Sequence, residues 1–245
     1  MTAADTAPPG PARRMSRLQK YLRQLVYGGN DGIVTTFATV AGFAGFAGTE
    51  ADGVAQIGGV AVLVFGLANL FADGVSMGLG EYLSGHSEDE LHARRRQAEL
   101  AAITQDPEGE SRATAGMLAA RGLPAADAAR IAEILRPHPG MMADLRMAYA
   151  GMFTGDGDNP AVNGGFTFLS FLAFGFVPLI PYILMEPTQT TFYWSLAATF
   201  TSLFALGLLR WRATEERFAR SVGETMTVGA VCAAVAFLVG RMVGG

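Results

Sequence analysis

The sequence has 245 residues, of which 50% are hydrophobic and only 16% are charged, and its mean hydropathy is +0.28. Soluble domains carry about 25% charged residues, so this chain has too few charges for an ordinary soluble fold. The net charge of −4 provides no basic surface for nucleic acid. The single cysteine, Cys232, excludes an internal disulfide and a cysteine-based zinc site.

Two segments precede the first long apolar stretch. Residues 1–12 are rich in proline and alanine and lack the basic start and apolar core of a cleaved signal peptide, so we expect a disordered tail. In residues 13–27, leucines at helical spacing lie among arginines and a lysine. This pattern predicts an amphipathic helix on an anionic membrane surface.

Five apolar segments follow and predict membrane-spanning helices. They lie at about 31–49, 54–84, 162–185, 189–209 and 225–243. The third is the clearest, because no charged residue occurs from Asn159 to Met185 and a crossing needs about 20 residues. Pro178 and Pro181 should kink it, which neighbouring helices can accommodate. The sequence therefore predicts an all-α integral membrane protein with five transmembrane helices.

The basic residues predict an orientation in the membrane. With five spans, the N-terminal segment, the long segment after the second span and the loop after the fourth share one side. All lysines and arginines except Arg241 belong to these three segments. By the positive-inside rule, the N terminus and residues 86–160 are cytoplasmic, and the C terminus lies on the other side.

Residues 86–160 predict a small helical insert between the second and third spans. Ser87, followed by Glu90, is typical of a capping box, so we expect a helix to begin there and to cover residues 87–104. Three shorter helices fit at about 108–121, 125–135 and 140–152. We thus expect four parts. A tail covers 1–12, and an N-terminal membrane part with the amphipathic helix covers 13–85. A cytoplasmic insert covers 86–160, and a C-terminal membrane part covers 161–245.

Acidic residues inside the apolar segments are the main functional signal. Asp31 lies at the start of the predicted first span, and Asp73 and Glu81 lie within the second. A carboxylate in the membrane costs about 3 kcal/mol on insertion scales, so such residues usually face a transport path or a partner. Residues four apart share one helix face, which here groups Asn69, Asp73, Met77 and Glu81.

This face combines two carboxylates, an amide and a thioether. Such a mixture of hard and soft donors suits a divalent first-row metal better than Mg²⁺, which prefers oxygen ligands. Structural interpretations remain open for three of the residues. Glu81 could lie at the headgroup level, Asp31 could simply start a helix, and Met77 could be a packing residue.

Two long motifs resemble the signatures of the vacuolar iron transporter family. The first is GGNDGIVTTFA at 28–38, and the second is ANLFADGVSMGLGEYLS at 68–84. The segment PLIPY at 178–182 and the order of five spans with an insert also agree, so the resemblance covers residues 20–243. We expect a bacterial-type member in a plasma membrane, because the composition is rich in arginine, alanine and glycine and poor in lysine.

The resemblance implies a homodimer that moves Fe²⁺ or Mn²⁺ out of the cytosol in exchange for protons. The transport path would be lined by the first two spans, with the metal as cargo and no permanently bound cofactor. By motif position, Asp31 corresponds to the essential acid of the first span and Met77 to the methionine of the second. Plant and fungal members have a glutamate where this chain has Asn69, and Asp73 could take over that charge.

The resemblance also implies that the insert binds metal. Glu99 and Glu110 match acidic positions of the family, whereas Ala102 and Ala113 replace neighbouring acids. We expect a weakened regulatory metal site, and the alternative is a solvated charged surface with methionines in the packing. The last predicted helix of the insert supplies the candidate ligands Met141, Met142, Asp144 and Met147.

The sequence therefore predicts a proton-coupled divalent metal transporter and not an enzyme. A membrane-anchored metal sensor or scaffold that binds ions without carrying them is the alternative. A carboxylate-bridged di-iron enzyme would need Glu-x-x-His pairs, and none occurs in the sequence. The expected partners are divalent ions, protons, membrane lipid and a second copy of the chain.

Overall fold

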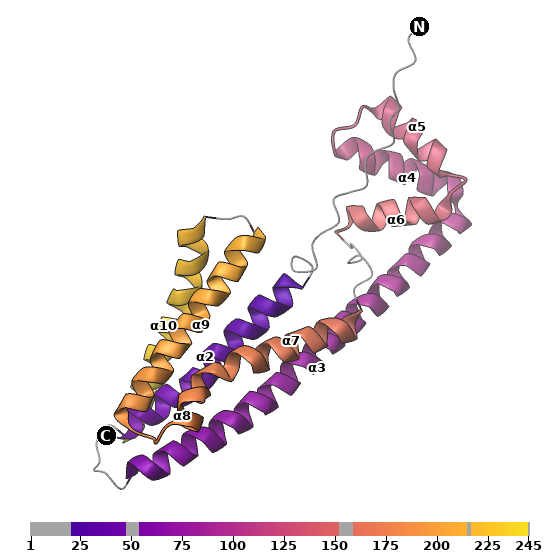
Figure 1. Cartoon of the computed structure of the whole chain (residues 1–245). Coiled ribbons are helices and arrows are strands. Elements are labelled where there is room, and N and C mark those ends of the chain that lie inside the picture. The colour runs from indigo at the N-terminus through magenta and orange to yellow at the C-terminus, as the bar shows by residue number, and fades with distance from the viewer. Residues whose placement is uncertain (1–20, 48–53, 152–158, 215–216, 245) are drawn as a thin grey trace. The chain divides into compact units, whose positions relative to one another are not determined.

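The computed structural model describes residues 21–47, 54–151, 159–214 and 217–244. Within these ranges the regular structure is helical without any strand, which confirms the all-α class (Figure 1). The predicted tail and residues 13–20 of the predicted amphipathic helix lie outside the described residues. The elements are α2 (Leu22–Ala47), α3 (Val54–Gln105), α4 (Pro107–Ala120), α5 (Ala125–Leu135), α6 (Pro139–Tyr149), α7 (Pro160–Gly175), the 3-10 turn η1 (Val177–Leu179), α8 (Ile180–Leu184), α9 (Gln189–Thr214) and α10 (Phe218–Gly244).

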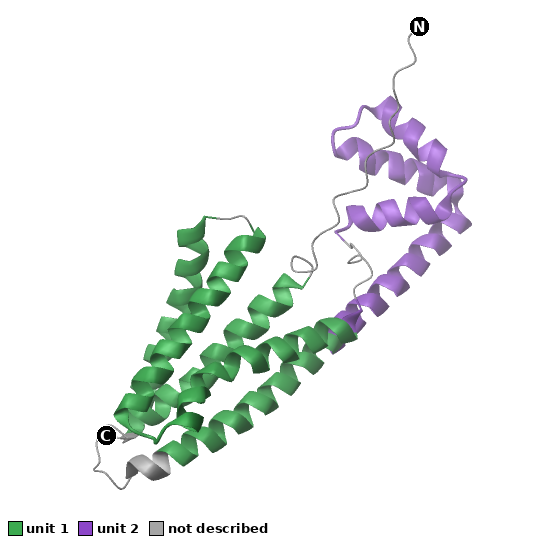
Figure 2. Cartoon of the chain, in the orientation of Figure 1, with its two compact units in different colours: residues 1–82, 161–245 green, residues 83–160 purple. Residues whose placement is uncertain are grey.

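The chain divides into two compact units (Figure 2). Unit 1 comprises Met1–Tyr82 and Ala161–Gly245, and unit 2 comprises Leu83–Pro160. This division lies beside the insert boundaries expected from the sequence, residues 86–160. Unit 1 holds the apolar helices, and unit 2 holds the charged insert.

Four described helical segments are long and apolar enough to cross a membrane. They are Gly59–Gln105, Pro160–Leu184, Gln189–Thr214 and Phe218–Val243. α2 has a comparable length of 26 residues, but Asn30 and Asp31 lower its hydropathy. Because α2 packs against both α9 and α10, we count it as a fifth span. The chain is therefore a multi-pass membrane protein.

Glycines allow α2 to lie very close to its neighbours. A Cβ atom at Gly28 would lie 2.6 Å from the carbonyl oxygen of Thr167 on α7, and one at Gly32 would collide with the carbonyl of Phe171. A Cβ atom at Gly45 would likewise collide with the backbone of α10. Small residues permit such backbone contacts between membrane helices, so these positions fix where α2 lies in the bundle.

The third span is interrupted, as the two prolines predicted. α7 ends at Gly175, and a 3-10 turn containing Pro178 leads into α8, which begins just before Pro181. Ser195 of α9 donates its hydroxyl hydrogen to the carbonyl oxygen of Pro178 at 2.6 Å. A neighbouring helix thus satisfies an acceptor at the break, which is how membrane helices tolerate proline.

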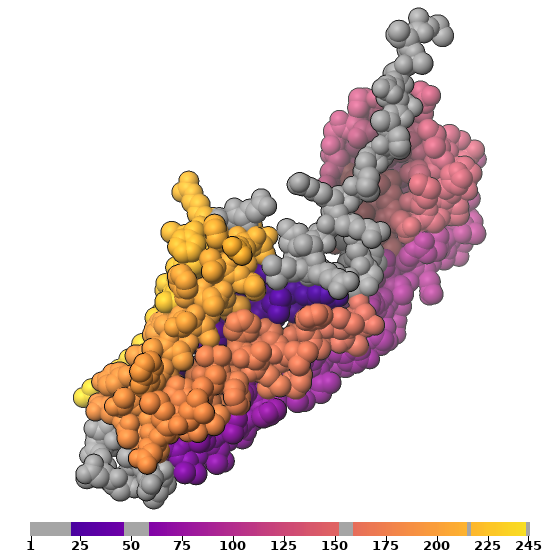
Figure 3. Space-filling view, viewed as in Figure 1, coloured from indigo at the N-terminus to yellow at the C-terminus, as the bar shows by residue number. Residues whose placement is uncertain are grey.

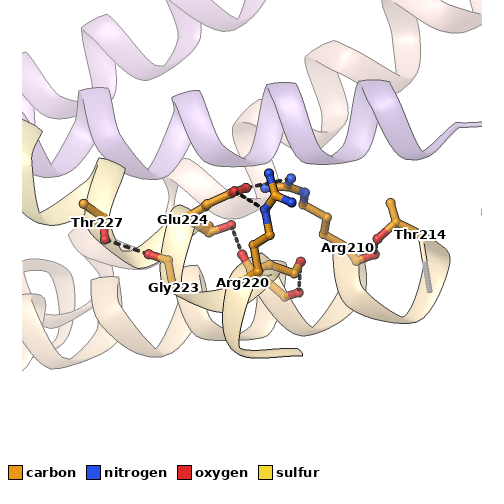
Figure 4. A network of polar contacts seen from close by, with 9 residues as sticks. Arg210, Thr214, Arg220, Gly223, Glu224 and Thr227 are labelled. Carbon is orange, nitrogen blue, oxygen red and sulfur yellow. Dashed lines mark hydrogen bonds and ion pairs between the residues drawn. The ribbon is translucent and has the colours of Figure 1, made fainter. Parts of the chain in front are cut away.

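A polar network joins the end of α9 to the start of α10 (Figure 4). Glu224 accepts hydrogen bonds from Arg210 at 2.9 Å and from Arg220 at 3.0 Å. Deeper in the same crossing, Ser221 donates to the carbonyl oxygen of Gly207 at 3.1 Å. These contacts tie the last two spans together at their polar ends.

The short helices of unit 2 begin and end at residues suited to those positions. Asp106 caps α4 by accepting a hydrogen bond from the backbone N–H of Gly109 at 2.9 Å, and Pro107 occupies the first turn. Gly122 follows α4 with a φ of +98°, a conformation that favours glycine. Pro139 likewise occupies the first turn of α6.

Two local predictions were wrong. Ser87 starts no helix, because α3 runs unbroken from the membrane part into the insert and the Ser87 hydroxyl donates to the carbonyl oxygen of Leu83 at 2.8 Å. A serine can make this bond one turn back inside a helix, so the capping pattern was misleading. Asp31 does not head its helix either, because α2 begins at Leu22 and includes the end of segment 13–27.

The close contact of α2 with α7 predicts a large cost for one added methyl group. Gly32→Ala should lower the free energy of unfolding by about 1–3 kcal/mol, because its Cβ meets the backbone of Phe171, which cannot move aside easily. Gly165→Ala is the matched control, since nothing lies within 4 Å of a Cβ there. The melting temperatures of the purified proteins in detergent test this, and equal values for the two variants would contradict it.

Candidate transport path and insert site

One side of α3 packs into the core of unit 1. Val62 and Leu70 are buried in a cluster with Phe171 of α7. The side that carries Asn69 and Asp73 is exposed. Figure 3 shows α3 as an outer strip of unit 1 beside α7. The structure therefore leaves two of the predicted path residues on an uncovered helix face.

Asp31 and Asp73, from two different spans, lie within electrostatic range of each other. Asp31 is half-buried inside α2, where its main-chain carbonyl accepts a hydrogen bond from the Thr35 hydroxyl at 2.8 Å. Its carboxylate lies close enough to that of Asp73 for the two charges to interact. Neither carboxylate forms an ion pair within the described ranges. The pair thus concentrates negative charge at one place in the bundle.

Met77 lies between the exposed face of α3 and the core. Since α3 is continuous, Asp73, Met77 and Glu81 lie at successive turns on one face, as the spacing predicted. The Met77 side chain is half-buried and packs against the cluster that contains Leu70 and Phe171. Its thioether therefore has a packing role whatever else it contacts.

Glu81 is held by two residues of α2. Its side chain is only 16% exposed, and its Oε1 accepts a hydrogen bond from Gln24 Nε2 at 3.1 Å. A guanidinium nitrogen of Arg23 lies 3.9 Å from Oε2. Sequence reasoning missed both partners, although Gln24 lies two helical turns before Asp31 and so on the same face of α2. Their contacts make Glu81 part of a polar cluster at the start of α2.

Some polar atoms in the spans are buried without a hydrogen-bond partner. They include Gln24 Oε1, Thr36 Oγ1 and Asn163 Oδ1. Leaving such an atom unpaired costs about 1–3 kcal/mol, so waters or ions commonly satisfy these groups. The interior of unit 1 is therefore more polar than its hydropathy indicates.

In unit 2, the predicted acidic ligands are already paired with arginines. Arg146 of α6 lies 3.0 Å from Glu99 and makes a short hydrogen bond to Glu110, and Arg96 lies 2.7 Å from Asp144. Sequence reasoning missed these partners as well.

The candidate methionines of unit 2 differ sharply in exposure. Met142 is fully buried in a small core with Ile103, and Met147 is 2% exposed, whereas Met141 is 63% exposed. Among the described residues, no group of three or more histidine, cysteine or acidic side chains is arranged to hold a metal. The metal-binding role of the predicted insert ligands therefore stays a prediction.

Comparison with known proteins identifies the family. A model of the VIT family matches residues 22–241. The chain belongs to the VIT family. Vacuolar iron transporter 1 of Arabidopsis thaliana is 30% identical over 91% of this chain and 86% of its own length, and vacuolar iron transporter 1 of Eucalyptus grandis is 28% identical over 88% and 84%. The vacuolar iron transporter of Plasmodium falciparum is 27% identical over 89% and 81%.

Membership of the VIT family confirms the resemblance seen in the two span motifs. It assigns the chain to a family of membrane transport proteins and not to enzymes. The expectation of a bacterial-type member is not borne out by these relatives, which come from plants and a parasite. In this VIT family member, the residues added by the structure are Arg23 and Gln24 beside Glu81, and Arg146 between the acids of the insert.

Proposed function

We propose that this VIT family member transports Fe²⁺ or Mn²⁺ out of the cytosol and moves protons in the opposite direction. The electrostatic interaction between Asp31 and Asp73, from two different spans, carries this proposal. Acids inside membrane helices usually serve an ion path, and here they share a region with the thioether of Met77. The curated relatives, which are named iron transporters, support the same activity.

The chemistry of these residues accounts for coupling to protons. Asp31 and Asp73 must be ionised to bind a divalent cation, and their mutual repulsion falls when the cation arrives. Protons arriving from the far side neutralise the carboxylates and release the metal. The sulfur of Met77 favours a transition metal over Mg²⁺ and Ca²⁺, which prefer oxygen ligands.

The contacts of Glu81 support a role at the cytoplasmic end of the path. Arg23 is a cation 3.9 Å from the Glu81 carboxylate, and its side chain is 79% exposed. The guanidinium is exposed to solvent and lies at the far limit of an ion pair, so the contact is weak and an arriving metal ion can displace it. Gln24 keeps the carboxylate in position during that exchange.

A homodimer would cover the exposed face of α3. Only 22% of the most apolar stretch of this span is buried within one chain. Asn69 and Asp73 are among the exposed residues of α3. An amide and a carboxylate facing lipid are costly, whereas a second copy of α3 places them in a shared polar interior. The proposed path therefore runs between two subunits.

For the location, we propose a plasma membrane with the N terminus and insert in the cytosol. The distribution of basic residues supports this orientation. The composition, rich in arginine and poor in lysine, supports the choice of membrane. The names of the relatives instead refer to the vacuole, so localisation of a tagged chain in its native cell distinguishes the two.

Metal flux in proteoliposomes tests the proposed transport. Fe²⁺ and Mn²⁺ uptake driven by an imposed pH gradient should fall at least about tenfold in Asp31→Asn, because one of two metal-binding charges is lost. Met77→Ala should reduce Fe²⁺ uptake more than Mn²⁺ uptake, since sulfur matters more for the softer ion. Asp127→Asn in the insert and Met242→Ala at the exposed end of α10 are matched controls and should retain full flux.

The same experiment distinguishes transport from the sensor or scaffold alternative. Binding of either ion without flux, by protein that is folded and dimeric, would establish a sensor and overturn the transport proposal. Flux that persists after the pH gradient has collapsed would leave transport standing and overturn proton coupling.

The Arg23 contact predicts a change in apparent affinity. Arg23→Ala should lower the metal concentration at half-maximal flux by about two- to fivefold, because a competing cation is removed and an ion pair with a solvent-exposed arginine contributes no more than about 1 kcal/mol. Gln24→Leu should raise that concentration, since Glu81 loses its positioning hydrogen bond. Arg212→Ala, an exposed arginine at the end of α9, is the control. Identical values for all four proteins would exclude this cluster from the path.

A further inference from the structure

Unit 2 is organised around one guanidinium group. Arg146 projects from α6 between the insert portion of α3, which carries Glu99, and α4, which carries Glu110. The Nε atom lies 3.0 Å from Glu99 Oε2, and a terminal nitrogen makes a short hydrogen bond to Glu110 Oε2. One side chain therefore links three helices of the insert.

The three side chains are mostly shielded from water. Arg146 is 22% exposed, Glu99 is 16% exposed and Glu110 is 24% exposed. Arg95 adds a second positive charge at 3.7 Å from Glu99. Two carboxylates are thus balanced by two guanidinium groups, and an added divalent ion would be repelled by both arginines.

A second arginine pair reinforces this arrangement on the same helices. Arg96 Nε lies 2.7 Å from Asp144 Oδ1, and its terminal nitrogen lies 3.4 Å from Oδ2. The hydrogen bonds to Asp144 raise the pKa of the Arg96 guanidinium above its usual value. Every candidate acidic ligand of the insert is therefore already neutralised by the chain itself.

Removal of Arg146 would leave Glu110 without its ion-pair partner and Glu99 with only the more distant Arg95. Glu99 Oε2 is buried and has no hydrogen-bond partner beyond the ion pair, so it depends on a nearby cation. A carboxylate pair of this kind, with water, is a donor set that suits hard divalent ions, Mn²⁺ among them. Arg146 thus lies where a divalent ion would bind if the arginine were absent.

We propose that Arg146 is a built-in substitute for metal in the insert, so that unit 2 folds without a divalent ion while Glu99 and Glu110 form a masked metal site. The guanidinium provides the cation that holds α3, α4 and α6 together, and its planar set of donors is always charged. The insert consequently does not sense metal. This inference does not depend on transport, since it concerns the folding of unit 2.

Hydrogen exchange of the full-length protein in detergent tests the proposal locally. Amide exchange is followed by mass spectrometry on peptides from residues 86–151, with excess Mn²⁺ or with a chelator. In the natural chain, exchange in these peptides should be the same in both conditions. In Arg146→Met, exchange with the chelator should be about tenfold faster or more, because two partly buried carboxylates lose their partner, and Mn²⁺ should restore protection.

Three further variants make the outcome decisive. Arg112→Met, at an exposed position of α4, should behave as the natural chain. Arg146→Lys keeps the charge and should remain insensitive to Mn²⁺. Glu99→Gln combined with Arg146→Met should abolish the rescue by Mn²⁺.

Two results would overturn the proposal. One is Mn²⁺-dependent protection of the insert in the natural chain, which would show that metal binds beside Arg146. The other is an Arg146→Met variant whose insert, in the presence of the chelator, exchanges its amide hydrogens as slowly as the natural chain does. The arginine would then not hold the helices together.

Discussion

Close backbone contact between α2 and its neighbours is the constraint on which the rest of unit 1 depends. Gly28 and Gly32 let α2 touch the backbone of α7, and Gly45 lets it touch α10. Any side chain at these positions would move the axis of α2 outward. Because Asp31 lies on this helix, the same contacts determine how near its carboxylate comes to Asp73 of α3. The packing of small residues thus positions the charges on which transport is proposed to depend.

The two units balance their acidic residues in opposite ways. In unit 1, Asp31 and Asp73 interact with each other, and within the described ranges no ion pair involves them. In unit 2, Glu99, Glu110 and Asp144 are each matched by an arginine. A pair of unneutralised acids can take up an external cation, whereas an acid already bonded to guanidinium resists one. The charge pattern therefore favours unit 1 as the part of the chain that handles metal.

The sequence allowed prediction of features that depend on composition and local chemistry. Apolar runs located the spans, and Pro178 and Pro181 indicated the break after α7. Prediction from sequence failed where a local pattern lay inside a longer helix, as when Ser87 suggested a helix start inside α3. It also missed contacts between distant segments. Arg146 and Glu110 are 36 residues apart, and Gln24 and Glu81 are 57 apart, so no spacing rule links them.

The neutralised insert has a consequence for selectivity along the proposed path. If the carboxylates of unit 2 are engaged by arginines, they cannot concentrate divalent ions ahead of the membrane. On the proposed path, an ion from the cytosol would then reach Glu81, where it competes with the exposed Arg23. That weak contact can regulate access but offers no chemistry that distinguishes iron from magnesium. Discrimination must therefore arise deeper, where the sulfur of Met77 lies one helical turn from Asp73.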